Sequence, residues 1–81
     1  MKTIILEILN KYDPISIAAD DRPDEYAPEA VRIASVFAHS MDLPVFTQAI
    51  HTVFVEMFDA VTAGPEERYR PIAEEILRTC G

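Results

Sequence analysis

Cysteine, glycine and tryptophan are scarce in this sequence, and their scarcity excludes several classes of protein. The 81 residues contain a single cysteine, Cys80, so no internal disulfide forms and a disulfide-rich secreted scaffold is excluded. Two glycines together with 49% hydrophobic residues argue for a packed globular chain and against a disordered one. A domain of this length buries only about 60% of its unfolded surface, so its stability must come from close packing or from a partner subunit.

Basic residues are also few. Lys and Arg total 7 against 14 Asp and Glu, which gives a formal net charge of −7. A field of this sign repels phosphate backbones and anionic membrane surfaces. We therefore expect neither nucleic acid nor a membrane as a partner.

Long apolar runs are absent from the sequence. No stretch reaches the roughly 20 apolar residues that a transmembrane helix needs. Lys2 and the apolar residues after it resemble the start of a signal peptide, but Glu7 interrupts the run and no small-residue cleavage site follows. We therefore expect a cytoplasmic protein.

Apolar residues recur at helical spacing through most of the chain. A first stripe predicts a helix over residues 2–12, which ends because Asp13 precedes Pro14. Pro28 suits the first turn of a second helix over residues 28–39. The stretch between these two helices has no period and reads as a long loop.

The second half of the chain predicts two more helices. The third, over residues 43–62, has an apolar arc wide enough for several neighbours, which makes it the central helix. The fourth covers residues 65–79 and is interrupted or kinked near Pro71. We expect one all-α domain over residues 1–81, a compact four-helix bundle-like fold with a long loop between helices 1 and 2. The expected centre of its core is Phe46, Ile50, Val53, Phe54 and Met57.

The loop over residues 13–27 carries a cluster of carboxylates, Asp20, Asp21, Asp24 and Glu25. Loops of this length in small domains are often functional, so these residues are candidates for a functional loop. Carboxylates bind divalent cations, but the alternation and the turn glycine of a calcium loop are missing. A solvated loop is the favoured interpretation.

Other chemistry-bearing residues favour structural roles. A zinc site at His39 and His51 needs two further ligands that the sequence does not supply nearby. No cationic cluster adjoins Cys80 in sequence to lower the pKa of its thiol. We therefore predict no catalytic residues, no metal and no cofactor.

A partner surface is predicted on the third helix. Steps of 100° per residue place four side chains on a strip at the edge of the apolar arc, with Val55 nearly opposite Phe46. An exposed valine beside a boundary phenylalanine suits contact with another protein or with a second copy in a two-fold homodimer. The alternatives are a scattered surface valine or a loop folded over it. The strip consists of His51, Val55, Phe58 and Thr62.

Short segments along the whole chain resemble the YugE-like family, a domain of unknown function in small bacterial proteins. In chain order these segments are Tyr12-Asp13-Pro14-Ile15, Asp24-Glu25-Tyr26, Phe58-Asp59, Gly64-Pro65 and Tyr69-Arg70-Pro71-Ile72-Ala73. They are caps, turns and core positions. The resemblance implies a compact helical bundle of bacterial origin and carries no activity or site.

Two classes of function fit these features. Acidic surface, a long loop and wide apolar arcs favour a small non-catalytic protein-interaction module over an enzyme. The alternative is a small ligand-binding protein or enzyme with a site between the 13–27 loop and the bundle. An acidic immunity protein against a basic toxin is a lesser alternative that agrees with the charge.

Overall fold

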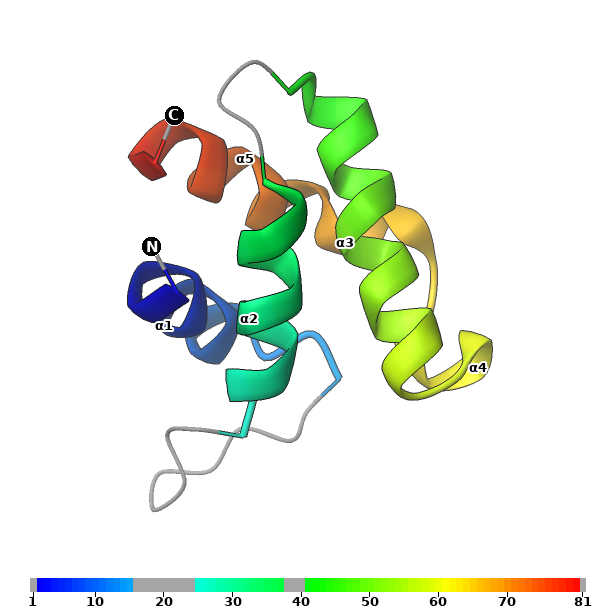
Figure 1. The fold of residues 1–81 in the computed structure, drawn as a ribbon. Helices are drawn as coiled ribbons and strands as arrows, with labels where there is room; N and C mark the ends of the chain where they lie inside the picture. Colours follow the sequence, from blue (N-terminus) through cyan, green and yellow to red (C-terminus); the bar gives the residue numbers. More distant parts are fainter. Residues whose placement is uncertain (1, 16–24, 38–40, 81) are drawn as a thin grey trace.

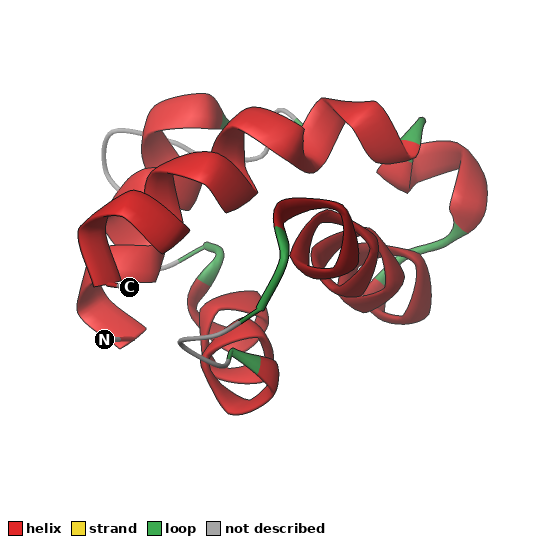
Figure 2. Cartoon of the chain, turned by 90° about the horizontal axis from the view of Figure 1, so that it is seen from above, coloured by secondary structure: helices red, strands yellow, loops and turns green. Residues whose placement is uncertain are grey.

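The computed structural model of the chain describes residues 2–15, 25–37 and 41–80. Within these ranges every regular element is a helix, so the all-α prediction is confirmed (Figures 1 and 2). In chain order the elements are α1 (Lys2–Tyr12), α2 (Ala27–Val36), α3 (Leu43–Met57), α4 (Ala60–Ala63), the 3-10 helix η1 (Glu66–Tyr69) and α5 (Arg70–Cys80).

The four longer helices form a closed ring around one core. Helix α1 packs against α2 and α5, and α3 packs against the same two helices from the other side (Figure 1). The short elements α4 and η1 also pack against α3. Helix α3 therefore has neighbours on several sides, as its wide apolar arc predicts.

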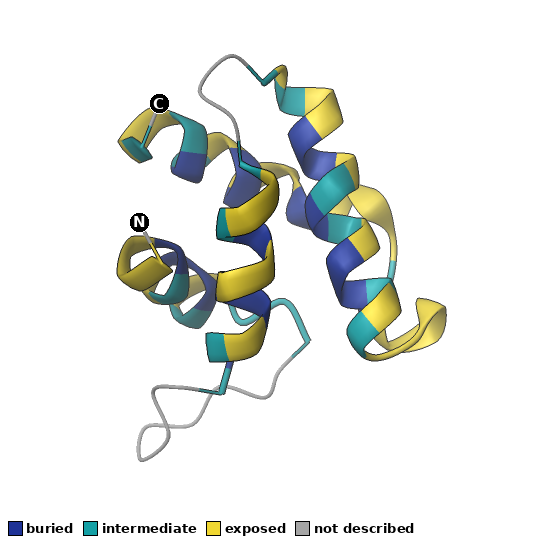
Figure 3. Cartoon of the chain, viewed as in Figure 1, coloured by how far each residue is buried: buried dark blue, intermediate teal, exposed yellow. Residues whose placement is uncertain are grey.

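Each element contributes to the core, whose residues lie on the inward sides of the helices (Figure 3). Of the five predicted central residues, four are buried, while Met57 is half-buried at the end of α3. The buried apolar residues are Ile5, Ile8 and Leu9 from α1; Tyr26, Ala30 and Ile33 at and within α2; Phe46, Ile50, Val53 and Phe54 from α3; Ala63, Tyr69, Ile72, Ala73 and Ile76 from the C-terminal elements.

Phe54 is the hub of an aromatic cluster within this core. Its ring centroid lies 4.9 Å from that of Tyr69 and 6.0 Å from that of Tyr26. Phe58 stacks on it at 6.0 Å. Phe54 of α3 thus packs against residues in η1, just before α2 and just after α3.

The predicted third helix over residues 43–62 is wrong at its C-terminal end. Helix α3 stops at Met57, and Phe58 leaves the helical region with φ −124° and ψ −96°. Asp59 then caps α4, because its Oδ1 accepts a hydrogen bond of 2.6 Å from the backbone N–H of Thr62. A local cap has broken the helix although its apolar pattern continues.

The second helix also differs from its prediction at one end, whereas the break predicted in the fourth helix is present. Helix α2 stops at Val36 instead of residue 39, because Phe37 becomes extended and packs edge-on against Phe46 at 5.5 Å. The fourth predicted helix is interrupted near Pro71 as expected: η1 covers Glu66–Tyr69, and α5 begins at Arg70 with Pro71 in its first turn. Pro71 lies in the first turn of α5, where a backbone N–H would have no partner within the helix, so a new helix can begin there.

Candidate functional site

The structure does not place the predicted partner strip on one helix face. His51 and Val55 belong to α3 and are half-buried, and Val55 packs against the core. Phe58 lies beyond the end of α3, is 37% exposed, and stacks against the core from the turn that follows. Thr62 belongs to α4. The geometry that motivated the strip required a continuous helix through residue 62, and a partner contact at these four residues stays a prediction.

Most of the acidic loop lies outside the described residues, which include neither Asp20, Asp21 nor Asp24. Glu25 is described and half-buried two positions before α2. Its charge acts on Glu29, one turn further along the chain. A functional role for the loop therefore stays a prediction.

Glu29 is a buried carboxylate in the first turn of α2. Glu29 is only 3% exposed, and no hydrogen-bond donor of the described chain reaches its Oε1. Burial raises the pKa of this carboxyl, and the charge of Glu25 raises it further. The folded protein therefore holds the Glu29 proton more tightly than the unfolded chain does.

The ends of the loop are clasped together by Tyr26. Its buried hydroxyl donates to Oδ1 of Asp13 at 2.6 Å and accepts the backbone N–H of Ile15 at 3.3 Å. Asp13 itself has a left-handed φ of 46° just after α1. The Asp13 side chain is thus part of the frame that holds the two ends of the loop.

Three side chains hold the turn between α4 and η1. Nε2 of His51 lies 2.9 Å from the carbonyl oxygen of Gly64; because a carbonyl only accepts, Nε2 carries the proton. The Tyr69 hydroxyl and Nη1 of Arg68 both donate to the carbonyl of Ala63. Gly64 has φ 76°, and a Cβ on it would lie 2.6 Å from Cζ of Arg68. The hydrogen bond of His51 to Gly64 therefore helps to hold this turn.

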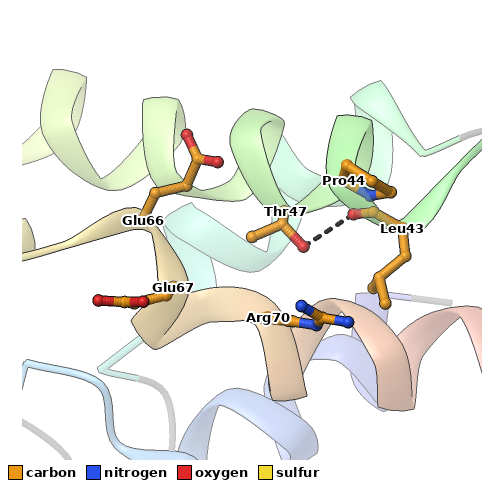
Figure 4. A pocket seen from close by; sticks show the side chains of 6 residues that line it. All are labelled: Leu43, Pro44, Thr47, Glu66, Glu67 and Arg70. Carbon is orange, nitrogen blue, oxygen red and sulfur yellow. Dashed lines mark hydrogen bonds between the residues drawn. The ribbon is translucent and has the colours of Figure 1, made fainter.

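A cavity of about 220 Å³ lies where the start of α3 meets η1 and α5 (Figure 4). It is lined by Leu43, Pro44, Thr47, Glu66, Glu67 and Arg70. The Thr47 hydroxyl donates to the backbone carbonyl of Leu43 at 2.7 Å. Figure 4 shows the side chains of Glu66 and Glu67 pointing away from each other. Their carboxylates do not converge on one point, as a cation site would require.

The described part of the chain places no three His, Cys, Asp or Glu side chains together as metal ligands. Cys80 is half-buried at the end of α5. One cluster of polar side chains in the described chain joins α1 to α5. Lys11 and Tyr12 of α1 both bind Glu75 of α5, at 3.0 and 2.9 Å. These two hydrogen bonds lower the pKa of the Glu75 carboxyl.

A larger hollow, which we call the α2–α3 groove, has a volume of about 340 Å³. Its apolar walls are Val36 of α2 and Val45 of α3, which are 41% and 51% exposed. Its other lining residues are Arg32, Gln48, Ala49, Thr52, Val53 and Glu56. Val53 is buried in the core, so the groove opens directly onto apolar side chains.

An ion pair borders this groove. Nη2 of Arg32 on α2 binds Oε1 of Glu56 on α3, and both side chains are about half exposed. An exposed pair of this kind contributes at most about 1 kcal/mol to stability. It ties the two helices together beside the groove while Val36 and Val45 remain open to solvent.

The sequence reasoning missed this groove, although a signal was present. Val45, Ala49 and Val53 recur every four residues along α3. This stripe lies beside the one that buries Phe46 and Ile50, and only Val53 belongs to both surfaces. Two adjacent apolar stripes on one helix indicate two packing partners.

In comparisons with known proteins, no family model, no curated protein and no solved structure matches the chain. None of the helices in the described segments is both long enough and apolar enough to span a bilayer.

Proposed function

We propose that the chain is a small non-catalytic protein-interaction module whose contact surface is the α2–α3 groove. The observation that supports this is the pair of valines, Val36 and Val45, exposed on two different helices beside one hollow of about 340 Å³. A single exposed valine is ordinary on a protein surface. Two of them above a buried apolar floor form a surface that gains stability when a partner covers it.

Each of the two valines is expected to add only a modest amount of binding free energy. Complete burial of an exposed valine contributes about 1.5 to 3 kcal/mol, so valines that are about half exposed have about 1 kcal/mol each left to gain. This agrees with a contact that centres on a few apolar residues and is surrounded by polar ones. Gln48, Thr52 and the Arg32–Glu56 pair supply that polar rim.

The test is affinity capture from a lysate of the source organism with matched variants as bait. Val45→Lys places a charge in the groove, whereas Val31→Lys places the same charge on α2 outside it. The two valines are 51% and 50% exposed, so the substitutions have similar effects on solvation and charge. Circular dichroism checks that both variants keep the helical content of the wild type.

We expect a protein that is retained by the wild type and by Val31→Lys but lost with Val45→Lys. Calorimetry with the purified pair should then show saturable binding with the same dependence on Val45. A partner retained equally by all three baits would place the contact elsewhere, at the strip of His51, Val55, Phe58 and Thr62 or at the loop.

Fractionation of the source cells tests the proposed cytoplasmic location.

A further inference from the structure

The groove has the length and pattern of a helix-binding surface. Its lining residues on α3 begin at Val45 and end at Glu56, a span of about 16 Å at 1.5 Å per residue. On α3 the apolar lining residues recur every four positions in one row, and the polar ones do so in a second row; the apolar row is Val45, Ala49 and Val53, and the polar row is Gln48, Thr52 and Glu56. About three turns of a second helix match this length.

The backbone of the groove also decides which shape of ligand it accepts. Its walls belong to α2 and α3, whose main-chain groups are already paired within the helices, and the described chain has no strand edge for an extended peptide to join. A ligand over an apolar floor must therefore satisfy its own backbone hydrogen bonds. An α-helix does so.

Charge determines the class of helix. Arg32 is the only Lys or Arg in α2 and α3, and Glu56 already neutralises it. Asp42 is exposed at the N-cap of α3, and the whole chain carries a net charge of −7. A second copy would bring the same charge of −7 to the interface and be repelled, whereas a basic helix is attracted.

We propose that the α2–α3 groove binds an amphipathic helix of another protein, with an apolar stripe flanked on both sides by Lys or Arg. This inference rests on the proposed function and adds the chemistry of the partner. The apolar stripe covers Val36 and Val45, and the flanking cations are attracted by the net charge of −7 that the whole chain carries. Electrostatic attraction raises the association rate, and the apolar contact gives the complex its lifetime.

The test uses designed peptides as probes. The first is a labelled, end-blocked helix of about 15 residues with leucines at positions i, i+3, i+4 and i+7 and lysines on both flanks. The second has the same composition with the leucine stripe scrambled, and the third has glutamates in place of the lysines. Each is titrated by fluorescence anisotropy into the wild type, Val45→Lys and Val31→Lys at physiological salt. Light scattering gives the oligomeric state of each protein.

We expect saturable one-to-one binding of the lysine-flanked amphipathic peptide to the wild type. Val45→Lys should weaken this binding at least about tenfold relative to Val31→Lys, because a charge in the contact centre must be desolvated. The scrambled and glutamate-flanked peptides should bind at least about tenfold more weakly than the first peptide.

Four results would overturn the inference. Equal affinities for Val45→Lys and Val31→Lys would mean that the peptide binds by charge alone. Equal binding of the glutamate-flanked peptide would remove the basic class of partner. A wild-type dimer that only Val45→Lys dissociates would make a second copy the occupant. A captured partner that depends on Val45 while the lysine-flanked peptide does not bind would leave the proposed function standing and refute only this chemistry.

Discussion

Replacing Phe54 by alanine removes the side chain on which most of the core converges. The side chain is fully buried, and its ring lies against those of Tyr26, Phe58 and Tyr69. Deletion of a buried phenylalanine costs about 3 to 5 kcal/mol, and aromatic pairs add about 0.5 to 1.5 kcal/mol each beyond area burial. We therefore expect a loss in the upper part of the 3 to 5 kcal/mol range (~4 to 5 kcal/mol).

This loss is large relative to the whole stability of a small domain, which is about 5 to 15 kcal/mol. The Phe54→Ala variant should be largely unfolded or melt far below the wild type in thermal and urea denaturation followed by circular dichroism. Phe54→Leu keeps most of the buried volume and should lose only about 1.5 kcal/mol, which provides a measurable value if the alanine variant does not fold.

Phe58→Ala is the matched control. It removes the same type of side chain four positions later, but Phe58 is 37% exposed and shares only one ring contact with the cluster. Its expected cost is about 1 kcal/mol. If Phe54→Ala and Phe58→Ala were equally destabilising, the burial that makes Phe54 the hub of the core would be refuted.

Further substitutions test the polar features of the fold. Burial raises the pKa of Glu29, so the folded state binds its proton more tightly than the unfolded state and stability falls as the pH rises through the folded pKa. Glu29→Gln should therefore be more stable than the wild type near about pH 8 and gain less near about pH 5 in urea unfolding; a pH-independent difference would contradict this. Tyr26→Phe removes the hydrogen bonds to Asp13 and the loop backbone and should cost about 1 to 3 kcal/mol in urea unfolding, and no change in the midpoint would disprove the clasp. Gly64→Ala forces a left-handed residue against Arg68 and should cost about 1 to 2 kcal/mol; an unchanged or higher melting temperature would count against the turn geometry.

The helix ends show where sequence periodicity is sufficient and where it is not. The C-terminal end of the first helix was predictable because Pro14 stops the helix by local sterics. The end of α3 was not, because Phe58 continues the apolar period while Asp59 offers a cap for α4. Periodicity and capping make opposite predictions at these two residues, and the energies that separate them are about 1 kcal/mol.

The candidate site was harder to predict because it belongs to a pair of helices. The sequence indicates an extra apolar stripe at Val45 on one helix and an exposed Val36 on another, but only the packing of α2 on α3 brings them together. The burial of Glu29 also depends on tertiary packing and was not predictable from the sequence. A glutamate in a first turn is an ordinary solvent-facing residue by pattern, and only the tertiary contacts of α2 bury it.

The closed ring of helices has a consequence for synthesis of the chain. Helix α1 leaves the ribosome before the other described helices but packs against α5, which is made after all of them, and Lys11 reaches Glu75 across 64 positions. Until α5 emerges, the apolar residues that α1 presents to it, such as Ile8, have no cover on that side. The nascent protein is therefore open to aggregation, proteolysis and chaperone binding until α5 has been made, because this helix closes the ring.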